Sequence, residues 1–136
     1  MTTNNHIAIE AIHHLTLTVS DVGRSREFYT SLFGFDVAGE FGPRVVLIKG
    51  STLLDLGPAP DPSKAISGDT FNENRVGLDH LSFSVTSQGE LEQAVSVLDQ
   101  KGVPHGEIVD LEPFKIKVLM LRDPDNIQVE LTASYA

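Results

Sequence analysis

The sequence contains an internal repeat, and this repeat limits the folds that the chain can adopt. The segment HLTLTVS, residues 14–20, aligns with HLSFSVT, residues 80–86, at an offset of 66 residues (80 − 14). Each aligned position holds an identical or chemically similar residue, and both copies alternate apolar with polar side chains. Such period-two alternation is typical of a β-strand with one buried face. The sequence therefore predicts two related modules.

Each of these strands is followed by the signals of a helix and then of three short strands. Ser20 or Asp21 can cap the first helix and Gly34 can end it, while Ser87 and Gly102 have the same roles in the second. One side of the first helix carries Phe28, Leu32 and Phe33. Strands are expected at 35–39, 44–49 and 52–56 in the first module, and at 106–110, 115–121 and 126–132 in the second.

The two modules are joined by segment 58–76, whose prolines and glycines predict a loop with one helical turn. A module of about 65 residues with a one-sided sheet buries little apolar surface by itself. We therefore predict an α+β fold in which two βαβββ modules, at about 11–57 and 77–133, form a single domain over 11–133. Residues 1–10 are expected to form an N-terminal tail.

Composition excludes several classes of function. The chain has no cysteine, which excludes disulfides, thiolate catalysis and cysteine-based zinc sites. Its net charge of −9 repels phosphate backbones and anionic lipids, so we expect neither a nucleic-acid nor a membrane partner. No apolar run approaches the roughly 20 residues that cross a bilayer. The N-terminus lacks the features of a secretory signal, so a cytoplasmic location is expected.

Strand parity assigns four ionisable side chains to the faces that point away from the helices. If the apolar residues of the repeated strands pack against the helices, the first residue of each repeat, a histidine, points the other way. The apolar residues of the last strand of each module leave a carboxylate on the same side. His13 has the opposite parity and is interpreted as a strand-edge residue. The four side chains are His14, Asp55, His80 and Glu130.

Two imidazoles and a carboxylate suit zinc, iron, nickel or manganese. Three protein ligands leave coordination positions for water or substrate, so that the metal can act as a Lewis acid. Asp55 can then be a fourth ligand or a general base. A histidine on a strand is more often structural when taken alone, but the equivalent repeat positions of His14 and His80 favour ligation.

The stretches HHLTLTVSDVGRSREFYTSLFGF, GLDHLSFSV and LRDPDNIQVEL resemble the vicinal oxygen chelate superfamily, also called the glyoxalase/bleomycin resistance/dioxygenase family. The resemblance covers the chain after its first ten residues. It implies paired βαβββ modules in a cupped mixed sheet, a homodimer, a small-molecule substrate and one divalent metal ion (Fe, Zn, Ni or Mn). The implied ligands are His14, His80 and Glu130. The position of Asp55 is a fourth ligand or acid/base group in glyoxalase I-like members, which usually carry Glu or Gln there.

Two departures from the family pattern narrow the range of reaction types. Extradiol dioxygenases typically carry a tyrosine where this chain has Met120, and fosfomycin-modifying relatives carry a basic residue after the final strand, where this chain has none. We therefore predict a metal-dependent lyase or isomerase of glyoxalase I-like type, in which Glu130 or Asp55 moves the proton. The alternatives are an Fe(II)-dependent dioxygenase using the same ligands and a non-catalytic drug-binding resistance protein.

Overall fold

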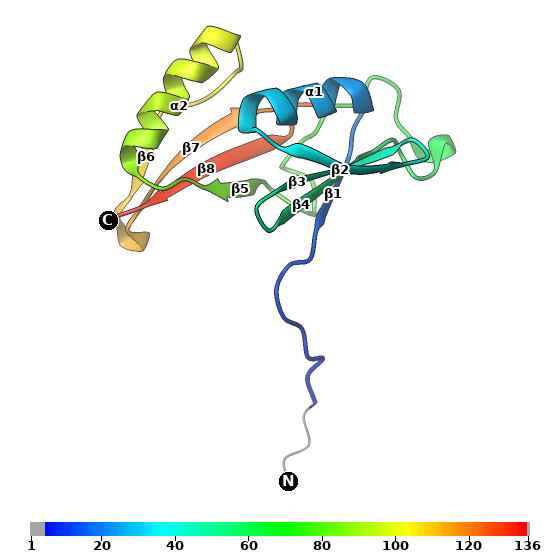
Figure 1. Ribbon diagram of the computed structural model, residues 1–136, viewed down its shortest axis with the longest axis horizontal. Coiled ribbons are helices and arrows are strands. Elements are labelled where there is room, and N and C mark those ends of the chain that lie inside the picture. Colours follow the sequence, from blue (N-terminus) through cyan, green and yellow to red (C-terminus); the bar gives the residue numbers. More distant parts are fainter. Residues whose placement is uncertain (1–4, 136) are drawn as a thin grey trace. The chain divides into compact units, whose positions relative to one another are not determined.

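A computed structural model describes residues 5–135, which divide into two compact units, one ending at Lys64 and one beginning at Ala65. The strand order in the first unit is β1-β4-β3-β2, with β1 parallel to β4 and the other neighbours antiparallel (Figure 1). Its elements are β1 (Leu15–Thr18), α1 (Val22–Phe33), β2 (Asp36–Phe41), β3 (Arg44–Lys49), β4 (Thr52–Gly57) and a 3₁₀ turn (Pro62–Lys64).

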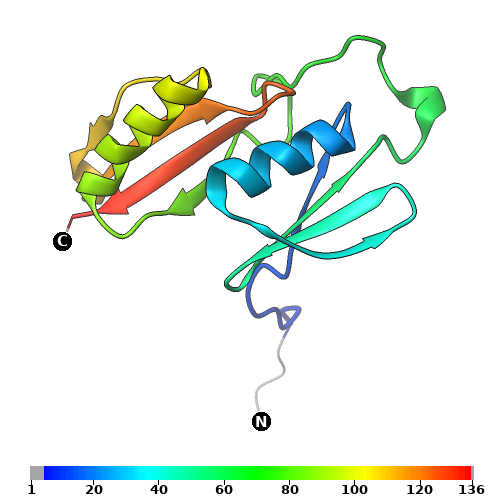
Figure 2. The same ribbon diagram turned by 45° about the horizontal axis from the view of Figure 1, so that its top comes forward.

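The second unit repeats this topology. Its strand order is β5-β8-β7-β6, and β5 is parallel to β8, just as β1 is parallel to β4 (Figure 2). The elements are β5 (Leu81–Ser84), α2 (Gln88–Lys101), β6 (Val109–Leu111), a 3₁₀ turn (Glu112–Phe114), β7 (Ile116–Arg122) and β8 (Gln128–Ser134). The predicted α+β fold with two βαβββ modules is therefore confirmed.

Both helices begin and end at the residues that the sequence indicates. The side chain of Asp21 accepts a hydrogen bond from the backbone N–H three residues on, at 3.0 Å, and Ser87 does the same at 3.3 Å. Gly34 and Gly102 follow the last helical turns with φ of 74° and 67°, a region that glycine enters without a steric penalty. These local signals fix where each helix lies along the chain.

The core of each unit lies between its sheet and its helix, because alternate strand residues point toward the helix. In β4, Leu54 and Leu56 are fully buried while Asp55 between them keeps 14% of its side chain exposed. In β8, Val129 and Leu131 are buried on either side of Glu130. The parity predicted for both carboxylates therefore matches the burial pattern.

The buried side of α1 differs from the expected one. Ser25 and Tyr29 are fully buried, whereas Phe28, Leu32 and Phe33 are half-buried. Residues four apart lie on one helix face, so Ser25 and Tyr29 together point into the core. The Tyr29 ring lies 5.0 Å from the Phe28 ring and 6.0 Å from the Phe33 ring, centroid to centroid. The phenylalanines thus flank the buried tyrosine.

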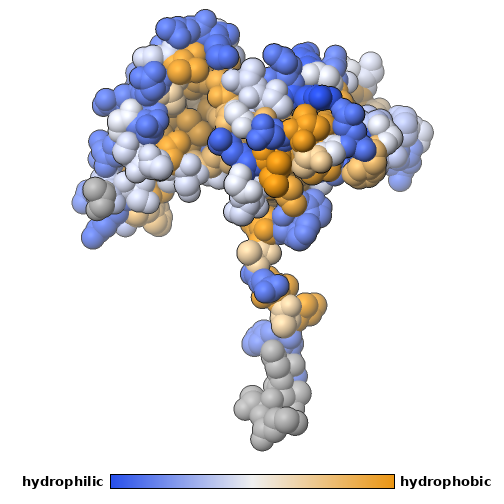
Figure 3. Space-filling view, viewed as in Figure 1, coloured by the Kyte–Doolittle hydropathy of each residue, from blue (hydrophilic) through white to orange (hydrophobic). Residues whose placement is uncertain are grey.

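Residues 5–14 add nothing to this core. Residues 5–14 are all exposed, and Ile7, Ile9 and Ile12 are each more than 80% exposed. Figure 3 shows hydrophobic atoms along this segment. The packed part of the first unit therefore begins at β1.

His105 joins the end of α2 to the chain that follows it. Its Nε2 lies 2.6 Å from Asp99 Oδ1, and its Nδ1 lies 2.6 Å from the carbonyl oxygen of Gly106. Neither oxygen can donate when Asp99 is ionised, so both contacts are hydrogen bonds when the imidazole carries two protons. The bond to Asp99, followed by that to Gly106, raises the pKa of His105 above its ordinary value of 6.5.

This contact predicts a pH-dependent stability. Because the folded-state pKa is raised, the contribution of His105 is complete below pH 6.5 and is lost as the pH rises through the folded-state pKa. Asp99 is exposed, so we expect a loss of only about 0.5 kcal/mol, measured by urea unfolding on either side of this window. Asp99→Asn should flatten the dependence. An unchanged pH profile in that variant would contradict the assignment.

Candidate metal centre

Of the predicted site residues of the first unit, Asp55 lies on the sheet face that points away from α1, and His14 directly precedes β1. Thr16 of β1 is paired in register with Asp55 of β4, and both lie on this face. Asp55 Oδ2 accepts a hydrogen bond from Arg44 Nη1 at 3.3 Å, whereas its Oδ1 is buried without a partner among the described residues. The Nδ1 atoms of His13 and His14 lie 2.9 Å apart, which leaves Nε2 as the nitrogen of His14 available to a metal.

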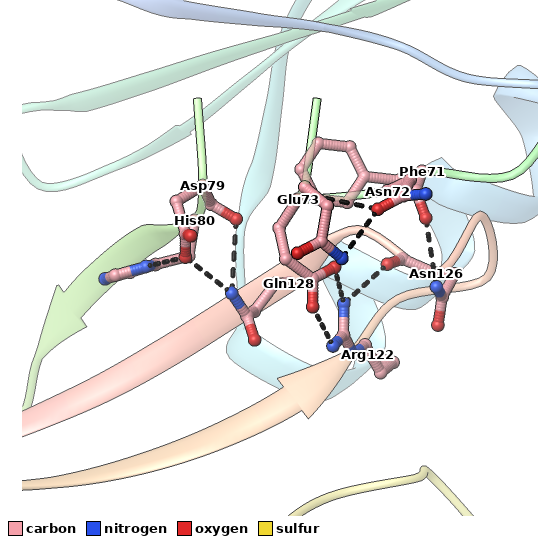
Figure 4. A network of polar contacts seen from close by, with 9 residues as sticks. Phe71, Asn72, Glu73, Asp79, His80, Arg122, Asn126 and Gln128 are labelled. Carbon is pink, nitrogen blue, oxygen red and sulfur yellow. Dashed lines mark hydrogen bonds and ion pairs between the residues drawn. The ribbon is translucent and has the colours of Figure 1, made fainter. Parts of the chain in front are cut away.

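In the second unit, His80 is held by its neighbour in the chain. Asp79 Oδ1 lies 2.8 Å from His80 Nδ1 and also accepts a hydrogen bond from Gln128 Nε2 at 2.8 Å (Figure 4). Gln128 additionally donates to the Asp79 carbonyl at 3.2 Å, and its side chain is buried in β8. A carboxylate on Nδ1 keeps the proton on that nitrogen, so Nε2 presents its lone pair.

Glu130 faces this lone pair. Its Oε2 lies 3.6 Å from His80 Nε2, and its Oε1 accepts a hydrogen bond from Thr132 Oγ1 at 3.0 Å. The hydroxyl of Thr132 is in turn 2.5 Å from that of Ser82 on β5. With 13% of its side chain exposed, Glu130 is largely shielded and held by a neighbouring hydroxyl. The register that pairs Ser82 with Glu130 across β5 and β8 brings these groups together.

The distance between His80 and Glu130 fits a shared metal ion. Two donors at about 2.0–2.2 Å from one tetrahedral zinc ion lie roughly 3.4 Å from each other. The observed 3.6 Å between Nε2 and Oε2 is close to this separation. Nitrogen and carboxylate oxygen are also the donor types that zinc, iron, nickel and manganese accept. The pair therefore fits the group that the family pattern implies.

The structure brings together part of the predicted ligand set. His80 and Glu130 form a pair in the second unit, while His14 and Asp55 belong to the first. Within residues 5–135, no three such side chains form a ready-made group that could hold a metal ion. Ligation by His14, His80 and Glu130 therefore stays a prediction.

A buried turn positions the strand that carries Glu130. Asp123, only 5% exposed, accepts hydrogen bonds through Oδ1 from the backbone N–H groups of Asp125 at 2.8 Å and Ile127 at 2.9 Å. Asn126 adopts a positive φ of 65° within this turn. Asx residues favour such turns because their side chains replace backbone acceptors. The turn thus fixes where β8 starts.

The segment that leads to β5 is anchored to the same turn. Arg122 donates to both carboxylate oxygens of Glu73, at 2.9 and 2.7 Å, and this contact lowers the pKa of Glu73 to about 2 (Figure 4). The backbone N–H of Phe71 donates to the Asp125 carbonyl at 2.9 Å, and the Phe71 carbonyl accepts a hydrogen bond from Asn126 Nδ2 at 3.0 Å. A polar groove of about 510 Å³ lies along this segment, lined by residues 66–75 together with Arg122 and Asn126.

Sequence reasoning missed the residues that orient the ligands. Strand parity does not indicate Asp79 as the group that joins Gln128 to His80. The signal was present, because a carboxylate directly before a ligand histidine lies within reach of Nδ1. Met120 is paired with Glu130 across β7 and β8.

Paired βαβββ modules of this topology define a known class of protein. The family model described as Glyoxalase/Bleomycin resistance protein/Dioxygenase superfamily matches residues 11–131. The chain belongs to this superfamily. None of the described helices is long and apolar enough to cross a membrane.

Relatives and solved structures agree with this membership. The uncharacterized protein YwkD of Bacillus subtilis is 30% identical over 131 residues, which are 90% of this chain and 96% of YwkD. The glyoxylase/bleomycin resistance protein/dioxygenase domain from Frankia sp. EAN1pec has a TM-score of 0.74 at 27% identity, with 93% of each chain covered. A mutant of the fosfomycin resistance protein FosX from Listeria monocytogenes, complexed with Mn(II) and 1S,2S-dihydroxypropylphosphonic acid, has a TM-score of 0.71 at 18% identity, covering 93% of this chain and 92% of that one.

Proposed function

We propose that the protein is a metal-dependent enzyme that acts on a small oxygenated molecule by chelation and proton transfer, of glyoxalase I-like lyase or isomerase type. The observation that carries this proposal is the pair of His80 and Glu130, 3.6 Å apart, with Asp79 on the far nitrogen of the imidazole. In this proposal His14 is the third ligand. An Mn(II) complex of FosX, a protein with the same fold, supports a divalent metal in a site of this kind.

The residues around the proposed metal site have separate roles in the reaction. A divalent metal, when bound, would polarise substrate oxygens and stabilise negative charge on them. Asp79 and Gln128 hold the His80 ring in one orientation, which avoids its reorganisation during the reaction. Glu130 is shielded and receives a hydrogen bond from Thr132, so its second oxygen is the one placed to accept a substrate proton. Asp55 is the other candidate base.

A deuterium-exchange experiment tests the type of reaction. Metal-loaded protein is incubated in D₂O with hydroxyacetone, lactaldehyde or glyceraldehyde, and ¹H NMR follows the hydrogen next to the carbonyl group. We expect catalysed exchange, reduced by Glu130→Gln in protein of equal metal content. Oxygen consumption that depends on substrate would favour the Fe(II) dioxygenase instead. Tight binding without exchange or oxygen uptake would favour the drug-binding alternative.

Replacing Asp79 tests the orientation of His80. We expect Asp79→Ala to weaken metal binding by about 10- to 100-fold, because residues that hold metal ligands in place have effects of this size. Binding is measured by competition with a chromophoric chelator. Asp69→Ala, which removes an exposed carboxylate that contacts neither His80 nor Glu130 in the described chain, is the matched control. Equal affinities in the two variants would exclude a role for Asp79.

The proposal also includes a homodimer, because the family resemblance implies one. Sedimentation equilibrium should then give twice the chain mass of 14.8 kDa. A single species at the mass of one chain would contradict it.

A further inference from the structure

Arg44 is the first residue of β3, and its side chain lies over the neighbouring strand β4. A Cβ atom built on Gly57 of β4 would lie 2.9 Å from Arg44 Nη1 and 3.0 Å from its Cζ. The guanidinium therefore occupies the space that any other residue at position 57 would fill. Only 26% of the Arg44 side chain is exposed, so a charged group has been drawn over the sheet and largely removed from water.

The contacts that Arg44 makes leave most of its hydrogen-bonding capacity unused. Its ion pair with Asp55 is a single contact of 3.3 Å between Nη1 and Oδ2. A guanidinium has five N–H donors, and among residues 5–135 no other acceptor for them is found. Asp55 Oδ1 is buried and has no hydrogen-bond donor among the described residues. The partly shielded guanidinium of Arg44 thus has capacity for a further polar group.

The surroundings on this face are polar and come from one unit. Thr16 and Thr18 of β1 are exposed, and they pair in register with Asp55 and Gly57 of β4. The two hydroxyls therefore lie in the same rows of the sheet as the carboxylate and the glycine under the guanidinium. All of these residues precede Lys64, where the first unit ends.

We infer that Arg44 binds the carboxylate group of the substrate. The planar guanidinium matches the two oxygens of a carboxylate, which it binds through parallel N–H···O contacts. A monoanion suits this position better than a phosphate dianion, because Asp55 is adjacent and the whole chain carries a net charge of −9. The substrate class is therefore a small carboxylic acid.

This inference about the substrate rests on the proposed function. The binding of an anion at Arg44 can nevertheless be measured in the absence of metal. The probe is lactate, a carboxylate with an adjacent hydroxyl, and lactamide is its uncharged analogue. Arginine Nε–Hε resonances are followed by ¹H–¹⁵N NMR in metal-free and in Zn²⁺-loaded protein. The Arg44 resonance is assigned by its loss in Arg44→Lys, and Arg75→Lys is the matched arginine control.

We expect lactate to shift the Arg44 resonance saturably in metal-free protein, with lactamide causing no such shift. Arg44→Lys should weaken lactate binding by about tenfold or more, because an ammonium group cannot form the paired contact. Gly57→Ala should also weaken it, since the added methyl group displaces the guanidinium. The amide spectrum of each variant reports whether it is folded.

Three results would overturn the inference: an equal shift with lactamide, undiminished lactate binding in folded Arg44→Lys, or tighter binding of inorganic phosphate than of lactate. Failure of the metal proposal has a different signature. In that case the zinc-loaded and metal-free proteins would give the same lactate titration, with the Arg44 shift intact.

Discussion

Replacing Asp123 with alanine should lower the free energy of unfolding by about 3 kcal/mol, because it leaves two shielded backbone N–H groups without their acceptor. Those groups belong to Asp125 and Ile127, which donate to Asp123 Oδ1 at 2.8 and 2.9 Å. The residue is 5% exposed, so water cannot readily replace the lost oxygen. Urea unfolding monitored by circular dichroism measures the change.

The effect should be specific to the buried turn. Asp36→Ala, at an exposed position on β2, is the matched control and should change stability by less than about 0.5 kcal/mol. Asp123→Asn keeps one side-chain oxygen and should fall between the two. A loss below about 1 kcal/mol in Asp123→Ala would mean that the turn does not depend on this carboxylate.

Replacing His14 with alanine should abolish stoichiometric metal binding, whereas replacing His13 should leave it intact. The two residues are adjacent and both are exposed, so burial does not distinguish them. Strand parity does, because His14 shares the parity of Thr16 and Asp55 on the face away from α1. Removing one of three protein ligands should lower metal affinity by at least about 100-fold, more than the loss of a residue that merely holds a ligand.

Metal content after dialysis against the free ion measures this difference directly. His80→Ala should behave like His14→Ala, because the two occupy equivalent positions of the repeat. Equal metal content in the His13 and His14 variants would contradict the parity argument. Circular dichroism of each variant excludes unfolding as the cause.

Much of the fold could be predicted because its signals are local. The run 44–49 has four consecutive apolar residues between two basic ones and ends before a glycine, and β3 has those bounds. The two helices end at glycines in the left-handed conformation. The short turn expected in the linker is the 3₁₀ turn Pro62–Lys64. Each of these features depends on a few neighbouring residues, which a single sequence displays.

Features that depend on tertiary packing were predicted less well. The strand expected at 106–110 is shorter and later, at Val109–Leu111, because Gly106 and His105 instead contact the end of β7 as an isolated bridge. The most buried residues of α1 are Ser25 and Tyr29, which point toward the sheet. Helical periodicity alone does not predict that they are more buried than the phenylalanines of the same helix.

In the candidate site, too, local features could be predicted from the sequence and tertiary contacts could not. Parity assigned His80 and Glu130 to one face, and the 3.6 Å contact agrees with that assignment. The hydrogen bond from Gln128 to Asp79 joins residues 49 positions apart, so only the register of β5 and β8 reveals it. The position of Arg44 over Gly57 emerges only from the antiparallel pairing of β3 with β4.

The most direct test of a metal-dependent function is the metal content of the protein itself. Protein is produced in medium containing iron, zinc, nickel and manganese, purified without a chelator, and analysed by inductively coupled plasma mass spectrometry. Ligation by His14, His80 and Glu130 predicts one divalent ion per chain. The identity of this ion would narrow the range of possible reaction types. Content well below one ion per chain under these metal-replete conditions would contradict both the lyase or isomerase and the dioxygenase, leaving a metal-free binding protein.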